Sequence, residues 1–111
     1  PDSIMSSLYS GAIATVYPSL CGPTNIPPLE SISLNTPLIC SDAYFMKNQL
    51  GNSAIFFNPK NYKSISKKIN LVLNSSKLRK KLIKNGRKKI SEYNINHFSK
   101  LLEEHINKLI V

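Results

Sequence analysis

Apolar residues along the chain fall first into short runs and then into longer stripes at helical spacing. Three short runs bounded by Gly, Pro, Asn or Asp predict strands, at Ile13–Tyr17, Pro37–Cys40 and Ala54–Phe57. Helical periodicity predicts helices at Pro27–Leu34, Ala43–Leu50, Tyr62–Leu73, Ser76–Tyr93 and Ile95–Ile110. Residues 4–10 are weakly helical and are expected to end at Gly11 as a C-terminal cap.

This order predicts a β-α-β-α-β unit followed by helices only. Right-handed crossovers would place the three strands side by side in one parallel sheet. The apolar run Pro37–Cys40 is expected to be buried on both faces, as parallel strands are. The fold class is therefore α/β: a partial Rossmann-like sheet flanked by helices, with a helical C-terminal tail.

The segment after the first strand is suited to an anion. Pro27 and Pro28 predict a helix start, where the first N–H groups lack partners within the helix and the macrodipole is positive. A diphosphate suits such a place, and Thr24 or Asn25 can add a side-chain oxygen or amide. Glu30, predicted in the first turn, would instead accept hydrogen bonds from vicinal hydroxyls such as those of a ribose. Alternatively, it is an ordinary first-turn carboxylate.

Polar residues also follow the second predicted strand. Ligands of open parallel sheets bind outside the carboxyl ends of the strands, which places Ser41 and Asp42 near the same site. Asp42 has a second interpretation, as the N-cap of the helix predicted from Ala43.

The order and spacing of several motifs resemble one family. Pro18–Ser19, Ile26–Pro27, Glu30 and the run Pro37-Leu-Ile-Cys-Ser-Asp42 follow the pattern P-S-x-x-E-G-F-G-L-P-x-x-E-A-x-A-x-G-x-P-V-I-x-S-D. That pattern is typical of the C-terminal domain of family-4 (group 1) glycosyltransferases of the GT-B class. Farther on, Leu50-Gly-Asn-Ser-Ala54 resembles the family's V-G-D-A-A and Phe57-Asn-Pro59 its F-x-P, so the likeness covers residues 4 to 92.

The match departs from the family in the loop. The family's first glutamate, eight residues before the second, falls on Gly22, so its contact with the donor sugar is absent. That role would pass to Thr24 or Asn25, or to a part of the protein outside this chain. Pro23 replaces a glycine and removes one backbone donor.

The resemblance implies a function. The chain would be the C-terminal half of the donor-binding domain of a retaining glycosyltransferase of bacterial surface polysaccharide synthesis. Upstream parts would supply the acceptor domain, the first strands of the donor domain and a basic pair that neutralises the diphosphate. The donor is a nucleotide-diphosphate sugar and the acceptor a glycan or lipid-linked molecule, with electrostatic stabilisation and neither metal nor cofactor.

The resemblance also implies the donor-binding residues, although no general base is evident and this part alone is expected to be inactive. They are Gly22, Thr24, Asn25, Ile26, Glu30, Ser41 and Asp42.

Composition limits the size of the core, the cellular location and the kinds of site that are expected. With 111 residues and 41% apolar content, the chain supports one modest core and not the two domains of a GT-B enzyme. No run approaches the about 20 apolar residues of a spanning helix and no signal-peptide layout opens the chain, which favours a cytoplasmic protein. Cys21 and Cys40 lack CxxC spacing, and His97 and His105 fit a chance placement on one helix, so neither a disulfide nor a metal site is expected.

The net charge of +9 is unevenly placed, since residues 60–89 contain twelve Lys or Arg and no Asp or Glu. Anionic lipid, nucleic acid or steering of the nucleotide-sugar would each explain such a block functionally. A solvated face enlarged by a Lys-, Asn- and Ile-rich composition is the simpler interpretation. No aromatic residue lies between Ser76 and Lys89, so nucleic acid is not expected as a partner of this block. Peripheral contact with the inner face of the membrane stays an alternative.

The chain is expected to divide at residue 93. Residues 1–93 would form the nucleotide-sugar-binding part, and residues 94–111 a terminal amphipathic helix. The apolar face of that helix would fold back, pack on the missing N-terminal domain, or meet a second copy in a homodimer. An alternative function is a noncatalytic nucleotide-binding or interaction module with a basic face for the membrane surface.

Overall fold

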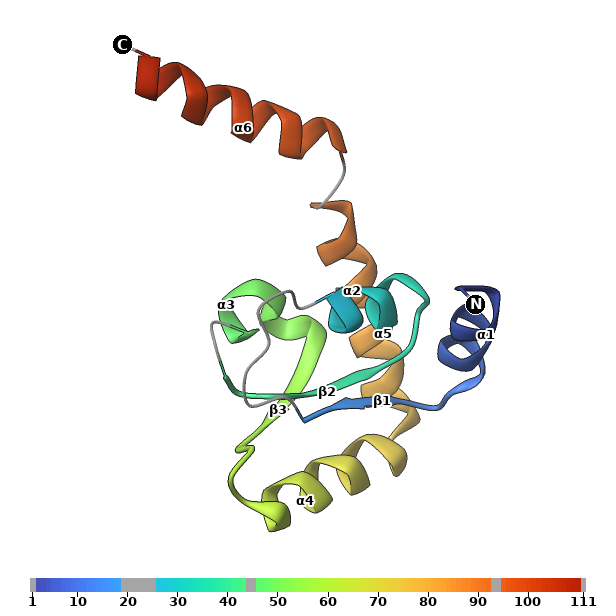
Figure 1. Ribbon diagram of the computed structural model, residues 1–111. Helices are drawn as coiled ribbons and strands as arrows, with labels where there is room; N and C mark the ends of the chain where they lie inside the picture. The colour runs from blue at the N-terminus through green and yellow to red at the C-terminus, as the bar shows by residue number, and fades with distance from the viewer. Residues whose placement is uncertain (1, 19–25, 44–45, 93–94, 111) are drawn as a thin grey trace.

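The computed structural model describes residues 2–18, 26–43, 46–92 and 95–110 (Figure 1). Helices and strands alternate as far as the third strand, and helices alone follow. The elements are α1 (Asp2–Gly11), β1 (Thr15–Tyr17), α2 (Ile26–Ser33), β2 (Leu38–Ser41), α3 (Met46–Leu50), η1 (Gly51–Ser53), β3 (Ala54–Phe57), α4 (Tyr62–Leu73), α5 (Ser76–Ser91) and α6 (Ile95–Ile110).

The sheet has three strands in the order β1-β2-β3, and both pairs are parallel. Thr15 lies opposite Leu38, and Leu38 lies opposite Ala54. All four residues of the central strand β2 are buried, as its uninterrupted apolar sequence predicts. The predicted partial Rossmann-like sheet is confirmed.

Each face of the sheet carries its own apolar cluster. On one face, Ile32 of α2 and Met46 and Leu50 of α3 pack with Leu38 and Cys40. On the other face, Ile39 and Phe57 pack with residues of α4 and α5, namely Val72, Leu82, Ile65, Ile69 and Leu78. Ile90, near the end of α5, packs against the first cluster, so α5 contributes to both faces.

α5 passes the amino-terminal end of the sheet. The Asn85 side-chain amide donates to the Asn52 carbonyl just before β3, at 3.0 Å. Arg87 Nε donates to Asn35 Oδ1, just before β2, at 2.9 Å. α5 therefore lies at the end of the sheet opposite to the carboxyl ends of the strands.

α2 ends in a Schellman motif. Asn35 has a left-handed φ of 60°, which asparagine tolerates better than most residues. The N–H groups of Asn35 and Thr36 donate to the carbonyls of Ile32 and Ser31 at 3.1 and 3.0 Å. This turn directs the chain straight from α2 into β2.

Gly86 is where α5 meets α2. It is buried, and a Cβ placed on it would lie 2.8 Å from Cγ2 of Ile32. A glycine inside a helix costs about 1 kcal/mol relative to alanine, and here it lets the two helices approach closely.

Several predicted boundaries differ from the observed ones. Gly11 is the last residue of α1 and not a cap beyond it. α2 begins at Ile26, so Glu30 is its fifth residue, and no acidic residue lies in its first turn. The first strand is confined to Thr15–Tyr17 because only these residues pair with β2.

Two apolar surfaces remain exposed on the described parts of the chain. β1 is an edge strand, and beside it Met5, Leu8, Tyr9, Ala12, Ala14, Thr15 and Val16 line a shallow groove. α6 extends away from the sheet and does not fold back onto it (Figure 1), which contradicts one of the three expectations for this helix. Its side chains Leu102, Ile106 and Leu109 are 50%, 45% and 86% exposed.

Candidate functional site

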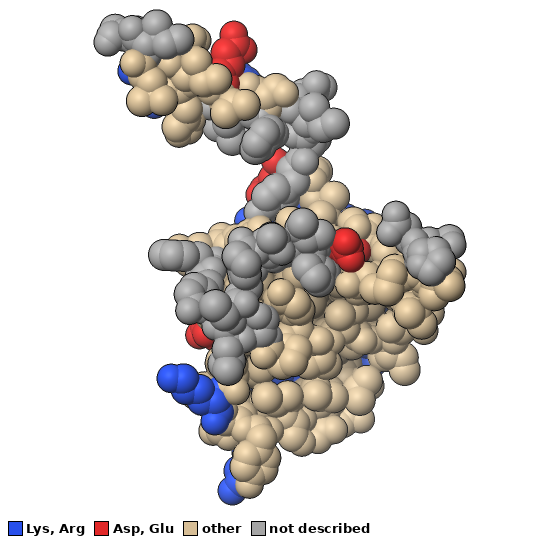
Figure 2. Space-filling model, viewed as in Figure 1, with Lys and Arg blue, Asp and Glu red and all other residues tan. Residues whose placement is uncertain are grey.

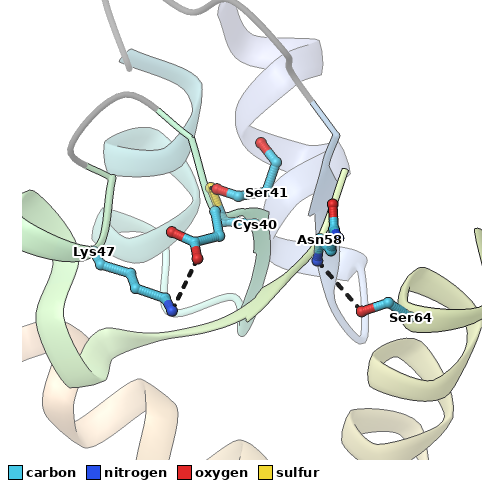
Figure 3. A network of polar contacts seen from close by, with 6 residues as sticks. Cys40, Ser41, Lys47, Asn58 and Ser64 are labelled. Carbon is cyan, nitrogen blue, oxygen red and sulfur yellow. Dashed lines mark hydrogen bonds and ion pairs between the residues drawn. The ribbon is translucent and has the colours of Figure 1, made fainter. Parts of the chain in front are cut away.

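The carboxyl ends of β2 and β3 bring polar groups together. Ser41 ends β2 and is buried, and the N–H of Asp42 donates to the Phe57 carbonyl at the end of β3, at 2.8 Å. The Asp42 carboxylate, about half exposed, accepts from Lys47 Nζ of α3 at 2.9 Å. Lys47 Nζ also lies 5.9 Å from the centre of the Phe56 ring. Figure 3 shows the ion pair of Lys47 as a dashed line, beside Cys40 and Ser41.

Asp42 does not cap a helix that starts at Ala43. Ala43 is not helical, and the described part of α3 begins at Met46. The N–H of Met46 donates to the Ala43 carbonyl at 3.1 Å, so Ala43 itself lies before the described part of the helix. The N-cap interpretation is therefore wrong, and the carboxylate is held by the Lys47 ammonium instead.

A mostly polar pocket of about 330 Å³ opens at this edge. Its walls come from the residue after β2, from α3, from β3 and the two residues after it, and from the start of α4. The lining residues are Asp42, Lys47, Phe56, Phe57, Asn58, Pro59 and Ser64. Figure 3 shows Lys47, Asn58 and Ser64 around this edge. The Asn58 N–H donates to Ser64 Oγ at 3.3 Å, and Asn58 Oδ1 accepts from the Lys60 N–H at 3.0 Å. Carboxylate, ammonium, hydroxyl and amide groups beside two aromatic rings suit a hydroxylated ligand.

Glu30 lies in a different pocket. Its side chain is exposed and lines a space of about 380 Å³ between α1 and α2, with Met5, Ser6, Tyr9, Ser33 and Leu34. The Tyr9 hydroxyl donates to the Glu30 carboxylate. Burial, followed by the charge and hydrogen bond of Glu30, raises the pKa of Tyr9, which stays a neutral donor at physiological pH.

Among the residues that the structure describes, Glu30 and Asp42 line two separate pockets that share no residue. Of the other predicted residues, Ile26 begins α2, and Gly22, Thr24 and Asn25 lie outside the described residues. Sequence analysis missed Tyr9, Lys47, Asn58 and Ser64. Polar residues directly after β3 could have indicated Asn58. Lys47 reaches Asp42 through the local path of the chain after β2, and Tyr9 reaches Glu30 through a tertiary contact, neither of which has a sequence signal.

In the described ranges, no three His, Cys, Asp or Glu side chains gather closely enough to hold a metal ion. Cys40 is a free, buried thiol, and burial raises its pKa to about 12, with the charge of Asp42 adding to the effect. No described helix combines the length and apolar character needed to cross a bilayer.

Comparison with known proteins decides the family. The model of the family "Glycosyl transferases group 1" matches residues 1–89, which include the whole sheet and most of α5. The chain belongs to the group 1 glycosyltransferases. The family predicted from the Pro18–Asp42 motifs is confirmed.

Two curated relatives of this glycosyltransferase chain are named for one process. The O-antigen chain mannosyltransferase RfbU of Salmonella typhimurium is 46% identical over 57 residues, which are 51% of this chain and 16% of the relative. The O-antigen chain mannosyltransferase B of Escherichia coli is 30% identical over 66 residues, 60% of this chain and 17% of the relative. The glycosyltransferase chain thus aligns with about a sixth of the length of either relative.

Proposed function

We propose that this chain is part of the donor-binding domain of a retaining glycosyltransferase of bacterial surface polysaccharide synthesis. The whole enzyme would transfer a sugar from a nucleotide-sugar to a glycan or lipid-linked acceptor. The observation that carries the proposal is the family match over residues 1–89, which falls on a parallel sheet with polar groups at its carboxyl ends. Since both relatives are named mannosyltransferases, a mannosyl donor is the first to test.

In this proposal the donor lies along the α2 side of the sheet. The diphosphate would lie near the N-terminus of α2 and the loop that contains Gly22, Thr24 and Asn25. Glu30 would accept hydrogen bonds from the ribose hydroxyls, with Tyr9 holding its carboxylate. Ile26, Ser41 and Asp42 would border the donor. Ionic and hydrogen-bonding groups would then stabilise charge in the transition state.

A two-dimensional NMR titration of the chain with uridine, guanosine, adenosine and cytidine diphosphates tests this assignment. Shifts confined to residues 22–31 and 40–43 are expected for the nucleotide of the donor. Glu30→Gln should weaken that binding by about 10- to 100-fold, because hydrogen bonds to a charged acceptor are lost. Glu103→Gln, an exposed glutamate of α6, should leave it unchanged. Shifts that persist in Glu30→Gln would contradict the role of Glu30.

We also propose the setting in which the enzyme works. It would act in the cytoplasm, in peripheral contact with the inner face of the membrane where a lipid-linked acceptor resides. The exposed apolar side chains of α6 would pack on the N-terminal domain of the whole enzyme or on a second copy.

A further inference from the structure

α5 carries a continuous cationic face. Helical geometry, at about 100° per residue, places six Lys or Arg side chains within an arc of about 120° and along about 16 Å of the helix. All six are exposed: Lys77, Lys80, Lys81, Lys84, Arg87 and Lys88. The buried residues Leu82 and Gly86 lie on the opposite side of the helix, so packing fixes which side faces outward.

None of the ion pairs between described residues neutralises this face. The ion pairs of the described residues join Lys47 to Asp42 and Lys89 to Glu92, and neither includes one of the six. Arg87 donates to Asn35, a neutral group. The nearest acidic residues in sequence are Asp42 and Glu92, so no acidic residue lies within α5 itself.

The position of this face separates it from the donor site. α5 passes the amino-terminal end of the sheet, through its contacts with Asn35 and Asn52, whereas the Asp42 pocket opens at the carboxyl ends of the strands. The face therefore makes no direct contact with a donor bound in the Asp42 pocket. The positive charge is also not spread evenly: residues 60–89 hold twelve Lys or Arg, and uncharged atoms dominate the face shown in Figure 2.

We propose that the cationic face of α5 binds the anionic phospholipid surface of a membrane. This inference rests on the proposed function, in which a lipid-linked acceptor keeps the enzyme at the membrane. The apolar side of α5 is buried in the core, so contact is by charge alone and without insertion. Exposed lysine side chains are long and flexible, so they can each reach a phosphate of a lipid headgroup. The face offers no aromatic ring on which a nucleic-acid base could stack.

Flotation of the chain with vesicles of phosphatidylglycerol and phosphatidylcholine tests the proposal. The chain should bind these vesicles at low ionic strength, release them as salt rises, and ignore pure phosphatidylcholine. The fourfold variant K77Q/K81Q/K84Q/K88Q should lose about 100-fold or more in affinity. The matched variant K60Q/K63Q/K67Q/K100Q removes the same charge from exposed positions elsewhere and should lose far less. Replacing the four α5 lysines by arginine should preserve binding.

Three outcomes would overturn the proposal. They are absence of binding to anionic vesicles at low salt, an equal loss in both fourfold glutamine variants, and tighter binding of duplex RNA or DNA through the same lysines. The last would assign the face to a different class of partner. Vesicle binding is measured without nucleotide, so its failure is distinguishable from failure of the donor titration.

Discussion

Some residues have a conformation that the sequence alone predicts, and others have contacts that only the structure shows. The C-terminal turn of α2 illustrates a local rule, since Asn35 adopts a left-handed φ that its residue type predicts. Gly86 and the Tyr9–Glu30 pair illustrate the opposite, because each depends on a residue distant in sequence. Ser41 and Asp42 could be placed at the edge of the sheet from the strand pattern. The Lys47 partner of Asp42 could not, because the turn at residue 43 sets their separation.

Gly86→Ala is expected to destabilise the chain. Alanine favours a helix over glycine by about 1 kcal/mol. The new methyl group, however, would lie 2.8 Å from Cγ2 of Ile32, whose β-branched side chain is buried and stiff. The overpacking costs about 1–3 kcal/mol and should exceed the helix gain, so the free energy of unfolding, measured in urea, should fall by up to about 2 kcal/mol. Gly11→Ala, with no atom within 4 Å, is the control and should be neutral or slightly stabilising.

The buried thiol of Cys40 should make stability fall at alkaline pH. Its pKa is about 12 in the folded chain against an ordinary 9.0, so between these values only the unfolded state loses the proton. The unfolded state then binds fewer protons, and stability declines by up to about 1.4 kcal/mol per pH unit. Urea unfolding from about pH 8 to 10.5, with Cys21→Ser in both chains, should show a steeper decline than in Cys40→Ala. Parallel pH profiles for the two chains would contradict this.

At the scale of elements, strongly patterned segments were predicted well. The bounds of β3, α4 and α6 agree with the sequence pattern, because a long apolar periodicity or a clear flanking turn defines them. α2 and α3 were less predictable. Ile26 is helical although it precedes a proline, a position that disfavours helix, and the turn at Ala43 left no local signal.

The start of α4 depends on one side chain. Asn61 Oδ1 accepts from the N–H groups of Lys63 and Ser64 at 3.0 and 3.4 Å, which satisfies two donors of the first turn. Asn61→Ala should therefore lower the free energy of unfolding by about 1 kcal/mol. Asn70→Ala, at an exposed position inside the same helix, should be neutral or slightly stabilising because alanine is the better helix former. Equal effects of the two changes would exclude the capping role.

At the scale of the molecule, the described residues form a packed part around the sheet and a terminal helix that packs little on it. The sheet and α2 to α5 share the two apolar clusters, whereas the described side chains of α6 contribute to neither. The sequence predicted the amphipathic pattern of α6 but not its position, because the side chains that would cover it are not among the described residues. Its expected partner therefore remains a prediction.

Removal of residues 94–111 is expected to change the free energy of unfolding by less than about 0.5 kcal/mol, since α6 packs little on the rest. Urea unfolding of the shortened chain measures this. Light scattering of both chains tests the proposed partners. A dimer that becomes a monomer on truncation would support a second copy, and a monomer in both cases would leave the N-terminal domain of the enzyme as the partner. A large loss of stability would show that α6 belongs to the core.

The open edge of β1 has a consequence for how the protein is made in a cell. Within the described ranges, one side of this strand has no neighbour in the sheet, and the apolar groove beside it includes Met5, Leu8 and Val16, all of them exposed. Unpaired strand edges next to apolar surface are the features that chaperones capture and that seed aggregates. The isolated chain is therefore expected to aggregate through this edge more readily than the whole enzyme, in which upstream strands of the donor domain would cover it.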